Sequence, residues 1–274
     1  MNDFVEVDWL AAHLDDPKVA IVDARSAPLS VYYASLGRDQ YLSAHIPRAV
    51  HLDYALDLRD PDSPHSARVA PPQRFAEVIG AAGIGNDVTV IAYDGGDVSY
   101  AARLVWMLHY YGHDDAAILD GGIDAWIAAG LPRASEIPSP DIVAFTPHVR
   151  ERLRAGREEV LDVAQGRSDA QLLSVSSDLA YGMRNREIPH ARRLSCSQLF
   201  DERDGGRLAS AERLRELTAA FDPNKRTITY CGNGVSSAGA YVALRVAGFT
   251  DVAVYDGSWA EWDHANLPTV AKTL

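Results

Sequence analysis

The sequence predicts an α/β protein built from two tandem domains, each a mainly parallel β-sheet with helices on both faces. Three observations lead to this fold class. Short apolar runs alternate with helical patterns, the order of these segments occurs twice, and a stretch rich in Pro and Ser separates the two copies. Strands that alternate with helices are typical of parallel sheets, whose crossover helices cover both faces. The 274 residues are enough for two ordinary domains.

Each copy has the same segments in the same order: a buried strand, a helix, a second strand, a second helix and a further strand. In the first copy these segments are residues 19–22, 75–82, 88–93, 101–111 and 118–119. In the second copy they are residues 171–175, 212–221, 227–230, 237–247 and 252–255. The strands are continuous apolar runs, and the helices show apolar residues three or four positions apart. Gly112 and Gly248 follow the second helix of each copy, where glycine favours the helix end.

Three matched motifs support the internal repeat. Residues 46–49 (IPRA) match residues 188–191 (IPHA), and residues 119–126 (LDGGIDAW) match residues 255–262 (YDGSWAEW). Between these motifs, Asp94 and Cys231 occupy equivalent places directly after a predicted strand. Because the three matches keep the same order, we expect a duplicated fold.

The domain bounds follow from the repeat and from the segment between the copies. Residues 132–147 are rich in Pro and Ser and show little periodicity, as a linker does. We therefore predict one domain at 1–133, a linker at 134–146 and a second domain at 147–274.

Composition and charge exclude several classes of function. The net charge is −12 and the pI is near 5.1, without a Lys/Arg cluster, so we expect no nucleic-acid partner. We also expect no membrane partner, because apolar runs of 18 residues or more are absent. The first 14 residues do not resemble a secretory signal, and Cys196 and Cys231 are too few for a disulfide framework or a zinc site. These features favour the cytoplasm, and an anionic substrate would need a locally positive pocket.

The most informative loop is at residues 231–236 (CGNGVS), after the strand at 227–230. Glycines at alternate positions, Gly232 and Gly234, allow successive backbone N–H groups to turn inward. The following helix adds free N–H groups and the positive end of its dipole. A sulfur at the base of such a loop is favoured as a thiolate nucleophile, and the loop could also hold the negative charge of a persulfide.

The loop alone leaves a structural interpretation open. Cys231 is also compatible with a small buried hydrophobic residue that ends a strand. The repeat favours the functional interpretation, because the first copy has Asp94 where the second has the sulfur. One active copy and one structural copy is the division we expect, with Asp94 holding the N–H groups of its loop in the manner of a helix N-cap.

Taken together, these motifs resemble the tandem-domain rhodanese family, which contains thiosulfate and 3-mercaptopyruvate sulfurtransferases. The resemblance extends over nearly the whole chain and is closest in the first half. Its motifs are residues 23–25 (DAR), 44–47 (AHIP), 83–86 (GIGN), 105–108 (VWML), 112–113 (GH), 120–122 (DGG), 188–191, 231–236 and 255–262.

The resemblance implies a sulfurtransferase whose first rhodanese-like domain is structural and whose second is catalytic. Cys231 would take a sulfane sulfur from a small anionic donor, thiosulfate or 3-mercaptopyruvate, and pass it as a persulfide to cyanide or a thiol. No cofactor is implied. The substrate-binding loop would comprise Gly232, Asn233, Gly234, Val235 and Ser236. Gly232 and Asn233, in place of basic residues, resemble the members that prefer 3-mercaptopyruvate.

The second half departs from the family pattern before its loop. Ser174 and Ser176 stand where the first half has Asp23 and Arg25, and Glu187 stands where a histidine usually precedes Ile-Pro. The family's substrate-binding arginine would fall near Ala180.

Two arginines a few positions further on, Arg184 and Arg186, are the candidates to replace the missing one. An arginine can bind an anionic donor through two parallel hydrogen bonds. The alternative is that both are solvated surface charges.

Two rival functions can be weighed against sulfur transfer. A cysteine-dependent phosphatase or arsenate reductase needs an arginine at the end of a Cys-x5-Arg loop, and Ser237 stands at that position. A weakly active or inactive rhodanese-fold module that binds or carries sulfur would keep the fold without the substrate residues.

Several other side chains have local structural interpretations. His45 is either a cleft residue or a structural hydrogen-bonding group, and Cys196 is either a second thiol or a buried structural residue. We expect core packing from Trp259 and Trp262. Asp23 and Arg25 are predicted to form a structural ion pair.

Overall fold

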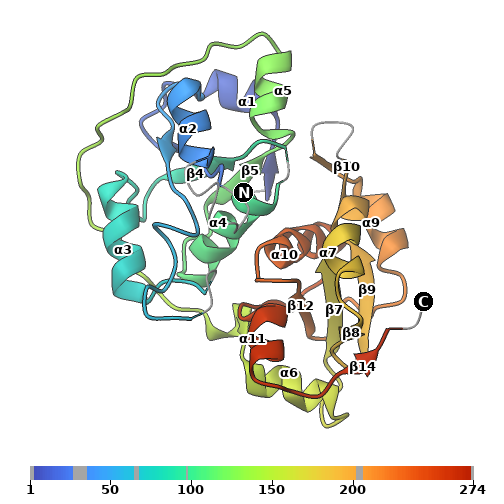
Figure 1. The fold of residues 1–274 in the computed structure, drawn as a ribbon. Coiled ribbons are helices and arrows are strands. Elements are labelled where there is room, and N and C mark those ends of the chain that lie inside the picture. The colour runs from blue at the N-terminus through green and yellow to red at the C-terminus, as the bar shows by residue number, and fades with distance from the viewer. Residues whose placement is uncertain (1–2, 27–35, 65–67, 97, 202–205, 273–274) are drawn as a thin grey trace. The chain divides into compact units, whose positions relative to one another are not determined.

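The computed structural model describes residues 3–26, 36–64, 68–96, 98–201 and 206–272. The chain divides into two compact units. Unit 1 holds residues 1–150 together with 201–208, and unit 2 holds residues 151–200 and 209–274. Each unit contains a five-stranded parallel sheet with flanking helices, so the predicted fold class is confirmed (Figure 1).

Unit 1 is built on a sheet with the strand order β1-β5-β4-β2-β3, in which every described pair is parallel. Its strands are β1 (Phe4–Val5), β2 (Val19–Asp23), β3 (Val50–His51), β4 (Thr89–Tyr93) and β5 (Ala116–Leu119). Its helices are α1 (Val7–Ala12), α2 (Leu36–Ser43), α3 (Pro72–Ala81), α4 (Ser99–Tyr110) and α5 (Gly122–Ala128). Central strand β4 is buried from Val90 to Tyr93, as expected of a strand covered on both faces.

Unit 2 repeats this plan with the strand order β6-β13-β12-β7-β9, again with parallel pairs only. Its sheet strands are β6 (Arg154–Ala155), β7 (Gln171–Ser176), β9 (Ala191–Ser195), β12 (Thr227–Tyr230) and β13 (Val252–Tyr255). Its helices are η2 (Glu151–Leu153), α6 (Arg157–Ala164), α7 (Asp178–Gly182), α8 (Cys196–Leu199), α9 (Ala211–Leu217), α10 (Ser236–Ala247) and α11 (Ser258–His264). Both units therefore place the strand before the Asp94 or Cys231 loop in the middle of the sheet.

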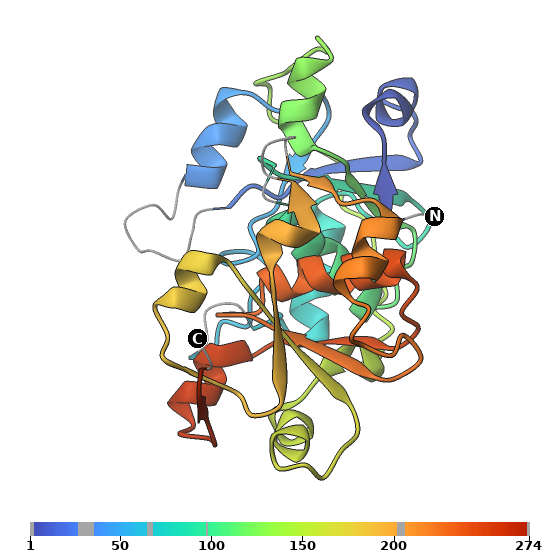
Figure 2. The ribbon, with the colours of Figure 1, turned by 90° about the vertical axis from the view of Figure 1, so that its right-hand side faces the viewer.

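Two short strand pairs lie outside the main sheets. An antiparallel pair joins β8 (Arg186–Glu187) to β14 (Val270–Ala271). The other pair is β10 (Phe200–Asp201) with β11 (Arg207–Leu208), at the segment that belongs to unit 1. Figure 2 shows these pairs in a second orientation.

The repeat extends to the packing of the cores. Trp126 in unit 1 and Trp262 in unit 2 are fully buried, and each belongs to the apolar cluster on one face of its sheet. The Trp126 indole N–H donates to the carbonyl of Pro132 at 2.8 Å, and that of Trp262 donates to the carbonyl of Pro268 at 2.9 Å. The matched motifs of the sequence thus mark one packing arrangement, used twice. Core packing by Trp262 is confirmed, whereas Trp259 is only partly buried and packs at the edge of its cluster.

One predicted helix ends earlier than expected. The helix predicted at 212–221 is α9, which ends at Leu217. The Thr218 hydroxyl donates to the carbonyl of Leu214 at 2.7 Å, and the Phe221 N–H closes a turn on the carbonyl of Thr218. A side chain that competes for helix carbonyls favours termination, so the C-terminal four residues of that prediction were wrong.

The segment between the copies follows the surface of unit 1. Residues 135–147 form neither helix nor strand. Val143 donates its N–H to the carbonyl of Gly80 at 3.1 Å, and Thr146 donates to the Asn86 side chain at 2.7 Å. The domain bounds 1–133 and 147–274 and the linker at 134–146 remain a proposal.

Two further features concern the described residues 3–26, 36–64, 68–96, 98–201 and 206–272. No helix there combines the length and the apolar character needed to cross a bilayer. Within the same ranges, no cluster of three or more His, Cys, Asp or Glu side chains could hold a metal ion.

Candidate active site

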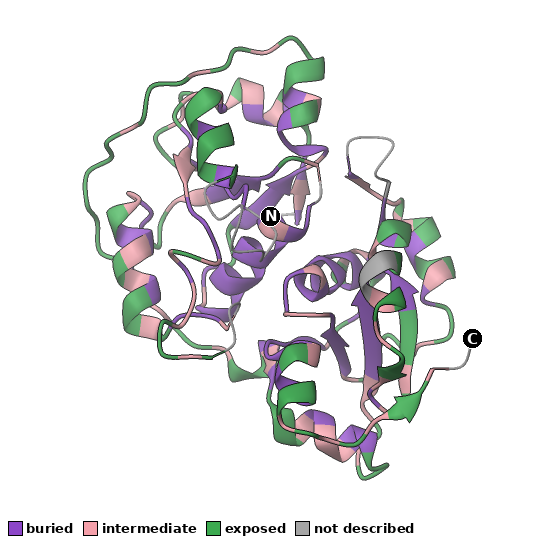
Figure 3. Ribbon diagram, in the orientation of Figure 1, coloured by how far each residue is buried: buried purple, intermediate pink, exposed green. Residues whose placement is uncertain are grey.

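The Cys231 loop starts where β12 leaves the middle of the unit 2 sheet and ends at the first turn of α10. The loop is tied to the start of α11. The N–H groups of Trp259 and Ala260 donate to the carbonyls of Cys231 and Gly232 at 3.1 and 2.9 Å, and the Cys231 N–H donates to the Ser258 hydroxyl at 3.2 Å. These bonds fix the backbone on both sides of the sulfur. Strand β12 and helix α10 are almost wholly buried (Figure 3), so the loop rests on a rigid support.

The sulfur itself lies inside the curl of the loop. Cys231 is 2% exposed, and the Gly234 N–H points at its Sγ from 3.2 Å. Gly234 has a φ of 90°, a conformation that glycine adopts without a Cβ clash. The Asn233 side-chain oxygen lies 3.9 Å from Sγ. An N–H group directed at sulfur stabilises its anionic form, and the N-terminal end of α10 acts in the same direction.

The predicted loop residues divide into two groups. The structure brings Cys231, Asn233 and Gly234 into mutual contact. Val235 is buried, and its carbonyl accepts the N–H of Ala238 in the first turn after the loop. Gly232 and Ser236 are half-buried on the loop backbone, and no contact to the sulfur is recorded for them.

In the equivalent loop of unit 1, the Asp94 carboxylate stands in place of the sulfur and accepts backbone hydrogen bonds. One Asp94 oxygen accepts the N–H groups of Gly96 and Val98 at 3.1 and 2.9 Å, and the other accepts those of Tyr100 and Ala101 at 3.1 and 3.0 Å. The capping role predicted for Asp94 is confirmed. The loop that precedes the second helix of each unit therefore has the N–H groups needed to hold a negative charge.

Arg184 and Arg186 lie in different surroundings. Arg186, on β8, is exposed and pairs with Asp263 at 3.0 Å. Arg184 is half-buried, donates to the Ser176 hydroxyl at 2.9 Å and stacks on the ring of Trp259 at 5.0 Å. Because Trp259 also bonds the Cys231 carbonyl, Arg184 lies against an anchor of the loop. Arg186 fits the alternative of a solvated surface charge.

A basic cluster surrounds Tyr181, and sequence reasoning identified only Arg184 of its members. Lys272 and Arg193 pack against the Tyr181 ring at 3.6 and 4.2 Å, and the Tyr181 hydroxyl donates to Glu187 at 2.8 Å. Burial and the bond to Glu187 raise the pKa of Tyr181 to about 12. Burial and the nearby Arg184 lower the pKa of Lys272.

The cluster gathers three basic side chains, Arg184, Arg193 and Lys272, on one side of an acidic protein, with Arg193 paired to Asp178. The sequence signal for it was the arginine pair at 192–193 directly after the repeated motif at 188–191. Lys272, near the end of the chain, carried no such signal.

The remaining candidate residues have structural roles. His45 is buried and bonds the carbonyls of Tyr41 and Glu136 at 2.8 and 3.1 Å, so its structural interpretation holds. Arg25 pairs with Asp23 at 2.5 Å, as predicted. Cys196 begins α8 and is half-buried, and it forms no disulfide with Cys231.

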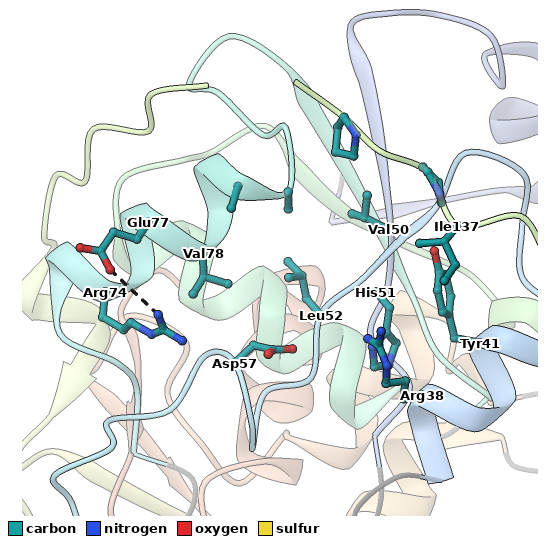
Figure 4. Close-up of a pocket in the computed structure, with 14 residues that line it drawn as sticks. Arg38, Tyr41, Val50, His51, Leu52, Asp57, Arg74, Glu77, Val78 and Ile137 are labelled. Atoms are coloured by element: carbon teal, nitrogen blue, oxygen red, sulfur yellow. Dashed lines mark ion pairs between the residues drawn. The ribbon is translucent and has the colours of Figure 1, made fainter. Parts of the chain in front are cut away.

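A cavity of about 510 Å³ opens in unit 1, away from any residue predicted for the site (Figure 4). Several of its polar side chains have partners within unit 1. Arg74 faces Glu77 at 3.9 Å, the Asp57 carboxylate accepts the Asp53 N–H at 2.9 Å, and the His51 ring bonds the carbonyl of Arg25 at 2.9 Å. We assign this cavity no role.

Comparisons with known proteins cover nearly the whole chain. The model of the rhodanese-like domain matches residues 6–129 and 157–265. The 3-mercaptopyruvate sulfurtransferase of Escherichia coli K12 is 33% identical over 97% of this chain and 96% of its own length. The thiosulfate sulfurtransferase of Bos taurus is 31% identical over 84% of this chain and 81% of its own length. The crystal structure of SseA from Escherichia coli, described as having the rhodanese fold, superposes with a TM-score of 0.86 at 28% identity, covering 94% of this chain and 99% of SseA.

Proposed function

Because the chain belongs to the rhodanese family and is a sulfurtransferase, we propose that it carries the transferred sulfur as a persulfide on Cys231. The observation that supports this assignment is the buried Sγ with the Gly234 N–H directed at it, in a loop that opens onto α10. No other cysteine stands in such a loop, since Cys196 begins the short helix α8.

The transfer has two steps in this proposal. The Cys231 thiolate attacks the outer sulfur of the donor and forms a sulfur–sulfur bond. The bond that joins this sulfur to the rest of the donor breaks, and the leaving group departs with the electron pair, as sulfite from thiosulfate or as an enolate from 3-mercaptopyruvate, which then takes a proton. In the second step a thiolate or cyanide attacks the outer sulfur, and Cys231 leaves as a thiolate. The sequence of steps needs no cofactor.

Residues of this chain hold charge in both steps. The Gly234 N–H and the N-terminal turn of α10 stabilise the sulfur anion before attack and after transfer. Arg184 draws the anionic donor toward the loop in a protein whose net charge is −12. Gly232, Asn233, Val235 and Ser236 complete the loop that encloses the donor.

The test is the intact mass of the protein after incubation with 3-mercaptopyruvate and, separately, with thiosulfate. We expect a gain of one sulfur atom that reverses on adding a thiol or cyanide. In Cys231→Ser the gain should be absent while the circular dichroism spectrum is unchanged. A sulfur gain retained in that variant would rule Cys231 out. If the native protein gains no sulfur from either donor, the module that only binds or carries sulfur becomes the better description.

The donor preference is a separate part of the proposal. Gly232 and Asn233 place no cation between Cys231 and α10, which disfavours the dianion thiosulfate relative to 3-mercaptopyruvate. We therefore expect a higher kcat/KM for 3-mercaptopyruvate. A clear preference for thiosulfate in steady-state assays would reject this part alone.

The partners in this proposal are small molecules: an anionic sulfur donor and a thiol or cyanide acceptor, with no nucleic acid and no membrane. The cytoplasm is the compartment we propose, because the acceptor step needs reduced thiols.

A further inference from the structure

One pair of opposite positions at the carboxyl edge of the sheet has different residues in the two units. In unit 1, Asp23 of β2 stands opposite Tyr93 of β4. In unit 2, Ser174 of β7 stands in the same register opposite Tyr230 of β12. The Tyr of this pair is kept in both units, and the carboxylate is replaced by a hydroxyl. The contacts of the Asp23 carboxylate in unit 1 therefore indicate which kind of ligand the equivalent positions of unit 2 could bind.

In unit 1 the carboxylate of Asp23 is the centre of a buried network. The Tyr93 hydroxyl donates to it at 2.8 Å, and Arg25 donates through Nε at 3.0 Å and Nη2 at 2.5 Å. Burial and the Asp23 charge raise the pKa of Tyr93 well above its ordinary value. A tyrosine hydroxyl and a guanidinium thus hold one carboxylate here.

Unit 2 keeps the donors of this network but not its side-chain carboxylate. Ser174 and Tyr230 are fully buried, and neither hydroxyl makes a hydrogen bond of normal geometry with the described residues. Burial raises the pKa of Tyr230 to about 12, although the nearby Ser174 hydroxyl, Arg184 and the Ile188 backbone act in the opposite direction. The Tyr230 hydroxyl lies near Ser174 and the Ile188 backbone, so the hydrogen bonding of these two hydroxyls is incomplete, and incomplete hydrogen bonding of a buried hydroxyl costs free energy.

Arg184 supplies the guanidinium from a different place in the chain. It reaches the Ser176 hydroxyl, at the position of Arg25, with one nitrogen, while its buried Nε and Nη1 have no partner among the described residues. Of the two acids that interact with the cluster, Asp178 pairs with Arg193, and Glu187 is bonded to Tyr181 and forms no ion pair with Arg184 within 4 Å in the described part of the chain. A buried guanidinium in this situation favours an anion.

We propose that Ser174, Arg184 and Tyr230 form a binding site for a small carboxylate in unit 2, at the position that the Asp23 side chain fills in unit 1. The donors available there are the two buried hydroxyls and the unbonded Nε and Nη1 of the guanidinium, and both Ser174 and Arg184 lie close enough to Tyr230 to act on its pKa. The carboxylate is either that of the sulfur donor, in which case the inference rests on the proposed function, or a free small carboxylate bound independently of it. The family's substrate-binding arginine position, near Ala180, is not part of this site.

The first experiment is thermal unfolding in sodium formate and in sodium acetate, each compared with sodium chloride at the same concentration. A ligand that binds only the folded state raises Tm, by roughly 3 °C at ten times its dissociation constant. We expect this rise over chloride in the native protein and in Arg186→Gln, the matched exposed arginine. We expect it to vanish in Arg184→Gln. Equal Tm values in formate, acetate and chloride for the native protein would overturn the proposal.

The second experiment restores the carboxylate of unit 1. Ser174→Asp places an acid beside Arg184 and Tyr230, so it should raise Tm in chloride and abolish the response to formate. If this variant keeps the full formate response, the site lies elsewhere and the proposal fails. If the Ser174→Asp variant does not fold, the test rests on the rise of Tm in formate over chloride, which should be present in Arg186→Gln and absent in Arg184→Gln.

Enzyme kinetics separate the two sources of the carboxylate. If the donor provides it, formate competes with 3-mercaptopyruvate and Ser174→Asp raises KM at least tenfold for this donor but not for thiosulfate. If a free carboxylate binds, formate raises Tm without changing KM. Either result supports the site. The sulfur gain on Cys231 is measured by mass independently of the formate response, so failure of the proposed function and failure of this inference are distinguishable.

Discussion

At the scale of single residues, the two candidate arginines make different predictions. Arg184→Gln removes a guanidinium that lies against the Trp259 anchor of the loop, whereas Arg186→Gln removes an exposed charge paired with Asp263. A hydrogen bond to a charged group contributes about 1.5–3 kcal/mol. We therefore expect Arg184→Gln to lower kcat/KM for an anionic donor by roughly 10- to 100-fold, mainly through KM.

Arg186→Gln is the control for that change and should stay within twofold of the native enzyme. The assay is steady-state sulfur transfer to cyanide with both variants at equal concentration. Equal losses in the two variants would show that the arginines act only through the overall charge.

Asn233 gives a second prediction at this scale. Its side-chain oxygen lies 3.9 Å from the Cys231 sulfur, so Asn233→Asp places a negative charge at that distance. Repulsion between like charges makes the thiolate less populated at neutral pH. We expect alkylation of Cys231 by iodoacetamide to slow at least tenfold at pH 7, while Asn233→Ser should react within about threefold of the native rate. An unchanged rate in Asn233→Asp would mean that this side chain turns away from the sulfur in solution.

At the scale of elements, the loop before α4 depends on one side chain. The Asp94 carboxylate satisfies four backbone N–H groups, and the loop holds Val98 at a φ of 61°, which is strained for a β-branched residue. Asp94→Asn loses the charge and turns an amide N–H toward donors. We expect a loss of about 1–3 kcal/mol in the free energy of unfolding, measured by urea denaturation.

Asp87→Asn is the matched control for that experiment, because Asp87 is exposed and pairs with the exposed Lys18. Its stability should be close to that of the native protein. Sulfur gain on Cys231 should persist in Asp94→Asn wherever the variant is folded, since the loop of unit 2 contains its own N–H donors. Loss of sulfur gain in folded Asp94→Asn would contradict the division into a structural and a catalytic copy.

The elements were largely predictable because each long strand and each second helix has a clear periodicity. The predicted strand at 252–255 is β13 without any change, and the predicted helix at 237–247 begins one residue late. Short elements such as β1 and α7 have too few residues to show a period, and their tertiary contacts define them. The early end of α9 depends on a hydroxyl of Thr218 whose bonding partner the sequence does not reveal.

The site was predictable only in part, for a physical reason. The Cys231 loop is a local structure, so its glycines and its neighbouring strand indicate it directly. The basic cluster around Tyr181 joins β9, α7 and the chain near its end, which are far apart in sequence. Likewise, the loss of Asp at position 174 was visible, but the entry of Arg184 into the same region required the structure.

At the scale of the whole molecule, the charge of −12 sets the long-range field around the sulfur. This field repels anionic reagents, and salt screens it with a Debye length near 10 Å at about 0.1 M. We expect the ratio of alkylation rates of Cys231 by iodoacetate and by neutral iodoacetamide to rise with ionic strength. The neutral reagent is the internal control. A ratio that falls with salt would mean that Arg184, Arg193 and Lys272 outweigh the global charge at the sulfur.

The segment at 201–208 belongs to unit 1, although it lies within the second copy of the repeat. It folds with unit 1, where the Leu208 N–H donates to Asp120 at 3.1 Å and Arg207 faces Glu6 and Asp120 at 3.5 and 3.6 Å. A polypeptide that ends at residue 150 therefore lacks residues 201–208 of unit 1. The complementary polypeptide contains these residues but not the unit to which they belong. The boundary of the duplication is therefore not the boundary of the folded units.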